Sequence, residues 1–137
     1  MTWYRRIHIG EPFEIGLDDA HRIRFVCNLI ADKAASDTFD KEILALLIAA
    51  GAGTLGTNLF LGSLYTLPVG DGPYLQVIRT AGRESDETHN SIAVPSYVRP
   101  GAQILSRGKT YGAVKGQITT AYNALRGVVN RNVTPIP

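Results

Sequence analysis

Apolar side chains recur every three or four residues in two early segments, a spacing typical of amphipathic helices. Residues 19–34 follow this spacing with Ile23, Val26, Cys27, Ile30 and Ala34. Asp18 and Asp19, just before them, are suited to begin a helix. Residues 38–50 follow it with Phe39, Ile43, Leu46, Leu47 and Ala50, and we expect the charged Asp40, Lys41 and Glu42 to face outward. Gly51 comes next, where glycine readily takes the left-handed conformation that ends a helix.

A third helix is predicted at about residues 110–128. Its apolar face consists of Tyr111, Val114, Ile118, Ala121, Tyr122 and Leu125. Gly112 and Gly116 lie inside it and would each cost about 1 kcal/mol relative to alanine. We therefore expect another segment to pack closely against these glycines.

Other segments have the pattern of strands and loops. Residues 3–15 alternate apolar and polar side chains around a Gly-Glu-Pro turn, which predicts a hairpin. Short apolar segments bounded by Gly, Pro and Asp predict strands at 58–62, 74–80 and 102–107. Residues 81–100 are polar and aperiodic, so we expect a long loop or arm. Residues 131–137 contain two prolines and are expected to form an extended tail.

The segment GAGTLG, residues 51–56, has the glycine spacing of a dinucleotide-binding loop. In such a loop a strand precedes the glycines, and the phosphates bind at the N-terminus of the helix that follows. Here the predicted order is reversed, with a helix before and a strand after. The interpretation we favour is a glycine-rich turn, with a small nucleotide-binding protein as an alternative.

Composition narrows the range of functions. The chain has 137 residues, 45% of them hydrophobic and 19% charged, which is typical of one globular domain. The formal charge of +2 is far from the basic excess of a dedicated nucleic-acid-binding protein. A single cysteine excludes an internal disulfide, and the longest apolar run is much shorter than a membrane span. We expect a protein made in a cytoplasm, with no membrane partner.

Candidate catalytic groups are sparse. The three histidines are far apart in sequence, and none has a second ligand at metal-binding spacing. Cys27 falls on an apolar face, which is typical of a buried structural thiol. We predict no catalytic, cofactor or metal site and no enzymatic activity. Basic residues gather loosely near the last strand and helix, at Arg99, Arg107, Lys109 and Lys115.

Several pieces, in order, resemble the tail terminator or tail-completion proteins of long-tailed bacteriophages, which are often called minor capsid proteins. A helix ends in the GAGTLG turn, a strand with NLFLG follows, and a second strand ends in TAG. Then the strand segment PGAQILSRG at 100–108 leads into a helix with an A…AY-x-A-L pattern at 113–130. The resemblance covers about residues 37–130.

The resemblance implies an α+β fold, with a small, mixed, mainly antiparallel sheet and two helices packed on it. Residues 1–36 would be an N-terminal extension of hairpin and helix, 37–130 the tail-terminator-like domain, and 131–137 a C-terminal tail. Family members usually continue with further strands after the last helix. We hypothesise that the N-terminal strand fills the edge those strands would occupy, or pairs with a neighbouring subunit.

The resemblance further implies a structural virion protein that assembles in the host cytoplasm. It would form a homohexameric ring that caps the tail tube and joins the tail to the neck or connector protein, and DNA would pass through the lumen without specific binding. Acidic residues such as Asp40 would balance the basic charge there. The alternative is a head-completion or connector subunit in the neck. Candidate interaction residues lie on the arm and the basic edge: Arg83, Glu84, Asp86, Glu87, Tyr97, Arg99, Arg107 and Lys109.

Overall fold

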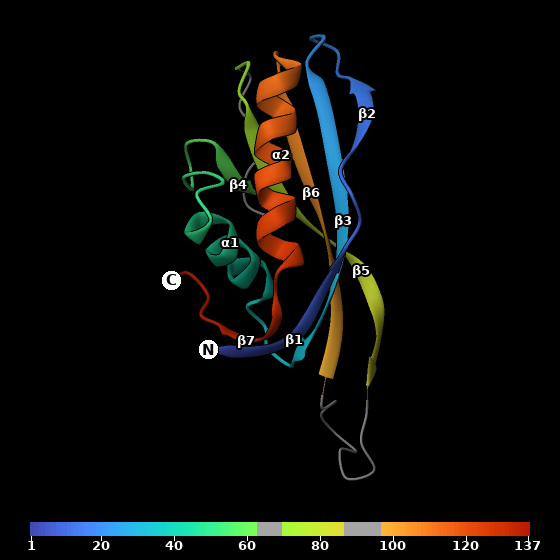
Figure 1. The fold of residues 1–137 in the computed structure, drawn as a ribbon, viewed down its shortest axis with the longest axis vertical. Coiled ribbons are helices and arrows are strands. Elements are labelled where there is room, and N and C mark those ends of the chain that lie inside the picture. Colours follow the sequence, from blue (N-terminus) through green and yellow to red (C-terminus); the bar gives the residue numbers. More distant parts are fainter. Residues whose placement is uncertain (63–69, 87–96) are drawn as a thin grey trace.

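The computed structural model describes residues 1–62, 70–86 and 97–137. They form a seven-stranded, mostly antiparallel sheet with two helices on one face (Figure 1). The predicted α+β class is therefore confirmed. The elements are β1 (Thr2–Ile9), β2 (Phe13–Leu17), β3 (Ile23–Ala34), α1 (Phe39–Ala49), β4 (Leu59–Leu61), β5 (Tyr74–Asp86), β6 (Tyr97–Gly108), α2 (Tyr111–Arg126) and β7 (Val129–Val133).

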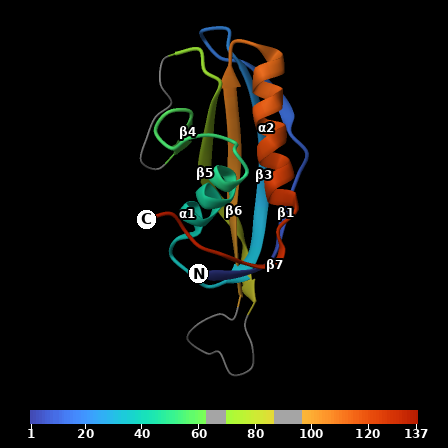
Figure 2. The ribbon, with the colours of Figure 1, turned by 60° about the vertical axis from the view of Figure 1, so that its left-hand side comes forward.

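The strand order is β4-β5-β6-β3-β1-β7, and β2 pairs with β3 alongside this path. Only β4 and β5 run parallel among the described pairs. Alternate residues of the long strands face the helices, as Cys27 of β3 and its cross-strand partner Ile104 of β6 do. Both helices contribute to the same core, through residues such as Ile43 of α1 and Ile118 of α2. Figure 2 shows α1 and α2 on the same side of the sheet.

The central strand β3 occupies the segment predicted as the first helix, so that prediction was wrong. β3 pairs with β6 along one edge and with β1 and β2 along the other. It is covered on both faces in places, so consecutive residues such as Val26 and Cys27 are both buried. A strand buried on both faces loses the strict alternation that distinguishes it from a helix. Asp18 and Asp19 consequently cap no helix and lie in the turn between β2 and β3.

The N-terminal segment forms two strands, but they do not make the predicted hairpin. β1 and β2 pair in succession with the same edge of β3, and β1 also pairs with β7. The three strands within residues 1–36 thus belong to the main sheet. The N-terminal strand pairs within its own chain, but it lies between β3 and β7, so the C-terminal strand β7 rather than β1 forms this edge of the sheet. β7 takes up the first part of the predicted tail.

The second predicted helix is confirmed as α1. Gly51 follows it with a φ of +75°, the left-handed conformation expected there. Glu42, however, is buried in the core rather than facing outward. The third helix is confirmed as α2, but the expected packing against its glycines was wrong: a Cβ atom at Gly112 or Gly116 would meet nothing within 4 Å among the described residues.

The three predicted strands are confirmed as β4, β5 and β6. The last two are much longer than predicted, because the polar residues 81–86 and 97–100 extend the β5–β6 ladder instead of forming a loop. This part of the ladder contains register shifts on either side of Arg83. The rest of the predicted arm, residues 87–96, lies outside the described residues.

Candidate functional site

The predicted interaction residues lie at two separate ends of the β5–β6 ladder. Arg107 lies at one end, followed by Lys109, and Tyr97 and Arg99 lie at the other, where Arg99 is in register with Arg83. Eight residues of extended strand separate Arg99 from Arg107, which corresponds to about 26 Å. The candidates therefore form no single site. Glu84 and Asp86 belong to β5, and Glu87 lies outside the described residues.

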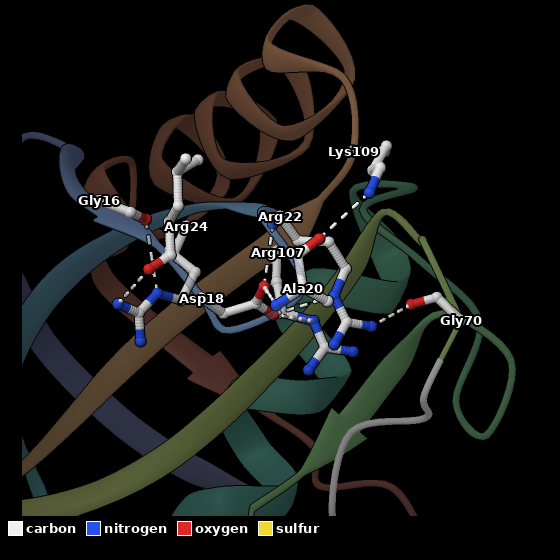
Figure 3. Close-up of polar contacts among 9 residues, drawn as sticks. Gly16, Asp18, Ala20, Arg22, Arg24, Gly70, Arg107 and Lys109 are labelled. Carbon is white, nitrogen blue, oxygen red and sulfur yellow. Dashed lines mark hydrogen bonds and ion pairs between the residues drawn. The ribbon is translucent and has the colours of Figure 1, made fainter.

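The first end carries a basic cluster that we define as Asp18, Arg22, Arg24, Arg107 and Lys109 (Figure 3). Asp18 is its centre. Its Oδ2 accepts a hydrogen bond from Arg22 Nε at 2.9 Å and lies 3.8 Å from Arg107 Nε. Its Oδ1 accepts the backbone N–H groups of Ala20 and Arg22, both at 2.9 Å. One carboxylate thus fixes the β2–β3 turn and joins it to β6.

The cations of the basic cluster also donate to backbone carbonyls. Arg22 Nη1 donates to Gly70 O at 2.7 Å, and Lys109 Nζ donates to Ala20 O at 3.1 Å. Arg24 donates to the carbonyl of Leu17. These contacts connect the β2–β3 turn with the segment before β5 and the segment after β6. The cluster therefore ties together the loops at this end of the sheet.

The charges of the basic cluster shift one another's pKa values. The backbone N–H of Arg22, more than any other contact, lowers the pKa of Asp18 below its ordinary value, and the Arg22 guanidinium lowers it further. Burial lowers the pKa of Arg107, and the neighbouring Arg22 charge adds to this effect while Asp18 opposes it. Arg22 and Arg107 contact the Asp18 carboxylate, whereas Arg24 and Lys109 donate to backbone carbonyls, so the cluster of four cations and one carboxylate carries net positive charge.

The other end of the ladder is built around Tyr97. The guanidinium of Arg5 stacks over the Tyr97 ring at 4.8 Å from its centroid, and Arg5 Nε lies 3.8 Å from Asp32 Oδ2. A shallow hollow of about 240 Å³ lies nearby, with Arg79, Arg83 and Arg99 among its lining residues. Asp40 forms an ion pair with Arg79 at 3.5 Å.

A larger open hollow of about 500 Å³ lies where β1, β3 and β5 approach one another. Its lining includes the ionisable side chains of His8 and Arg83, together with Asn28 and Thr80. The Asn28 amide oxygen already accepts a hydrogen bond from Gln103 at 3.1 Å.

The most connected polar group in the core is Glu42, which the sequence pattern had placed outside. Its carboxylate accepts hydrogen bonds from four hydroxyl groups, at 2.7 to 2.9 Å: Thr2, Tyr4, Ser36 and Thr38. Lys33 Nζ lies 3.3 Å from Glu42 Oε1, and both side chains are fully buried. We call these six residues the Glu42 network. The helical spacing indicates this burial, because Glu42 is three residues after Phe39 and four before Leu46 and so lies on the buried stripe of the helix.

Burial by itself would raise the pKa of Glu42, but the four donated hydrogen bonds lower it below its ordinary value. Burial lowers the pKa of Lys33, and the Glu42 charge opposes that effect. Tyr4 has a raised pKa, because it is buried and its hydroxyl donates to a carboxylate. The Glu42 network holds β1, β3 and α1 together, and the contacts described here for Glu42 are all with side chains of the same chain.

Cys27 is buried in the core, as predicted, and burial raises the pKa of its thiol to about 12. Such a thiol is a poor nucleophile at neutral pH. Among the described residues, no three His, Cys, Asp or Glu side chains are grouped so that they could hold a metal ion.

The GAGTLG segment forms a turn whose amides are largely used within the protein. Thr54 N–H donates to Asn58 Oδ1 at 2.6 Å, and Gly56 N–H donates to Leu59 O at 2.9 Å. The amides of Gly51 and Ala52 donate back to the last turn of α1. A phosphate-binding loop needs amides directed at the ligand. The geometry favours the interpretation of this segment as a turn between α1 and β4.

Comparison of the chain with protein-family models, with curated proteins and with solved structures gives no match. Within the described ranges, no helix combines the length and the apolar character needed to cross a membrane.

Proposed function

We propose that the chain is a structural virion protein that forms a hexameric ring, caps the tail tube of a long-tailed bacteriophage and joins the tail to the head connector. One observation carries the proposal: the strands at 58–62, 74–80 and 102–107 lie in one sheet with both helices on it, in the order that the resemblance implies. The likeness in sequence is thus accompanied by the expected order and packing of elements.

The side-chain chemistry is in keeping with a structural role. The most buried charged groups, Lys33 and Glu42, satisfy each other and neighbouring hydroxyls. The basic cluster likewise directs its donors to a carboxylate and to backbone carbonyls. Enzymes usually keep strongly perturbed ionisable groups in a cleft that a substrate can enter. Here these groups hold strands, helix and turns in place.

The charge distribution suits a ring around DNA. The formal charge is only +2, and Asp18 and Asp40 each pair with arginine side chains. Binding that neutralises many phosphates would hold DNA in the lumen and depend steeply on salt. A near-neutral subunit with balanced arginines lets DNA pass while its subunits pack side by side.

The proposal is tested by electron microscopy of the purified protein, alone and mixed with purified tail tubes. We expect sixfold rings and rings at one end of the tubes, with co-sedimentation of protein and tubes. Binding to purified neck or connector rings without binding to tubes would instead support a connector subunit. A protein that stays monomeric and ignores both partners would refute a ring-forming role. Calorimetric binding of a nucleoside triphosphate or dinucleotide would favour the nucleotide-binding alternative.

A further inference from the structure

The larger hollow lies on the face of the sheet that α1 and α2 leave open (Figures 1 and 2). His8 of β1 is in register with Ile30 of β3, and Ile30 with Gly101 of β6. Gly101 is in turn in register with Thr80 of β5. Side chains alternate between the two faces of a strand, and the neighbouring Leu29 belongs to the core that the helices share. The row from His8 to Thr80 therefore crosses the open face.

An irregularity in β5 forms one wall of this hollow. Register shifts lie on either side of Arg83, and Gly82 has a φ of +73°. A Cβ atom at Gly82 would collide with the carbonyl oxygen of Arg99, so β5 passes close to β6 at a point where only glycine fits. Bulges of this kind commonly re-aim a side chain at a functional surface. Arg83 lines both the larger hollow and the smaller one, so the two hollows meet at its side chain.

The larger hollow combines hydrogen-bond donors with apolar surface. The side chains in its lining that can donate are His8, Asn28, Thr80 and Arg83. Asn28 accepts the Gln103 amide through its Oδ1, so its amide nitrogen is the part that can donate to a ligand. Ile9 and Ile30 supply the apolar surface. This lining suits a ligand group that has acceptor oxygens at the end of an apolar stem.

The charges around Arg83 favour an acidic ligand group. Arg79 and Arg99 line the smaller hollow with it, and the described lining of the two hollows includes no aspartate or glutamate. Asp40, which pairs with Arg79, lies outside that lining. Arg83 and Arg99 are directly opposite each other in the β5–β6 ladder, where like charges repel. A carboxylate bound beside them would offset this repulsion and accept paired hydrogen bonds from a guanidinium.

We infer that the two hollows form a docking surface for an acidic segment of a partner protein, with a carboxylate side chain at Arg83 and apolar neighbours over Ile30. The sites of small molecules usually enclose most of the ligand, whereas this hollow is open and suits a side chain that projects from a larger partner. The apolar surface of Ile9 and Ile30 favours a protein segment over DNA, because a phosphate backbone gains nothing from it. The inference goes beyond the proposed function and does not depend on the ring.

Fluorescence anisotropy with labelled synthetic peptides tests the docking surface. The probes are an extended peptide of alternating glutamate and valine, and the same peptide with glutamine in place of glutamate. At low ionic strength, where exposed charges are least screened, the protein should bind the glutamate peptide about tenfold more tightly or better. Added salt should remove most of this difference. Equal affinity for the two peptides, or no binding of the glutamate peptide, would overturn the inference.

Arginine substitutions locate the charge that matters. Arg83→Ala should weaken binding of the glutamate peptide by about tenfold to a hundredfold, because it removes a charged hydrogen-bond donor. Arg126→Ala is the matched control, since Arg126 is an exposed arginine at the end of α2 and lines neither hollow. It should leave the affinity unchanged, and both variants should keep the unfolding temperature of the wild type. An equal loss of affinity in the two variants would show a general charge effect and overturn the assigned site.

Nuclear magnetic resonance locates the bound peptide. The glutamate peptide should shift the backbone amides of Asn28, Thr80 and Gly82 more than those of α2. Short duplex DNA that shifts the same amides and binds more tightly than the peptide would overturn the inference in favour of a nucleic-acid surface. Sixfold rings without peptide binding would refute the docking surface and leave the proposed function standing. Peptide binding at these residues by a protein that forms no ring would support the docking surface and count against the proposed function.

Discussion

Replacing Glu42 is expected to destabilise the protein more than any other single charge removal among the described residues. In Glu42→Gln the side chain keeps its size, but Lys33 loses its counter-charge in a site from which water is excluded. The hydroxyls of Thr2 and Tyr4 also lose a charged acceptor at 2.7 Å. Removing one partner of a buried ion pair typically costs about 3–5 kcal/mol. This is a large part of a total stability of about 5–15 kcal/mol.

The assay is equilibrium unfolding in urea, followed by circular dichroism, together with a thermal scan. For a domain of this size the expected loss lowers Tm by about 10–20 °C. Glu14→Gln is the matched control, because it removes the same charge from the exposed strand β2. It should change stability by about 0.5 kcal/mol or less.

The pH dependence gives an independent check on the reasoning. The pKa of Glu42 is lowered in the folded state, so its contribution is fully present above the ordinary glutamate pKa. That contribution is lost as the pH falls through the lowered folded-state pKa. The stability difference between wild type and Glu42→Gln should therefore be largest at neutral pH and shrink in acid. A variant within 1 kcal/mol of wild type, or a difference that is the same at pH 7 and pH 3, would refute the proposed role of the network.

Three further outcomes are expected. Gly51→Ala should destabilise the protein by about 1–2 kcal/mol, because alanine is strained at a φ of +75°. Gly116→Ala should stabilise it by up to about 1 kcal/mol, because this glycine lies in a helix with open space around it. Urea unfolding measures both changes. Cys27 should react with Ellman's reagent at the rate of global unfolding, and rapid modification of the native protein would contradict its burial. Asp18→Asn should lower Tm at neutral pH. The difference in Tm from wild type should disappear as the pH falls through the lowered pKa of Asp18. An equal difference at all pH values would argue against the ion pairs of Asp18.

The two helices that the sequence predicts correctly each have one buried face. α1 and α2 each have one apolar stripe, and the glycine after α1 marks its end, so local pattern and tertiary structure agree. The central strand β3 was mistaken for a helix for the opposite reason. Side chains on both of its faces are buried in places, and residues such as Val26 and Cys27 then follow one another without alternation. Its pairing with β1, β2 and β6 defines it as a strand, and β6 lies more than 60 residues away in the chain.

The polar parts of the fold were harder to predict than the apolar ones. Residues 81–86 were interpreted as a loop because their side chains are polar, yet their backbone pairs with β6. Glu42 was placed in solvent because charge usually indicates exposure. Its burial depends on the hydroxyls of Thr2 and Tyr4, which β1 contributes from a distant part of the sequence. Partners distant in sequence cannot be recognised from local periodicity.

The pairing of β1 with β7 has a consequence for how the chain acquires its structure. Thr2 lies in register with Val133, so two strands about 130 residues apart in the sequence pair with each other. β3, β6 and α2 can assemble while synthesis continues, but the outer edge of β1 has no partner until residue 133 has emerged. Contacts between such distant segments form slowly, since closing the longest loop has the largest entropic cost. We therefore expect docking of β7 to be the final step of folding, after which both termini are held on the same side of the domain.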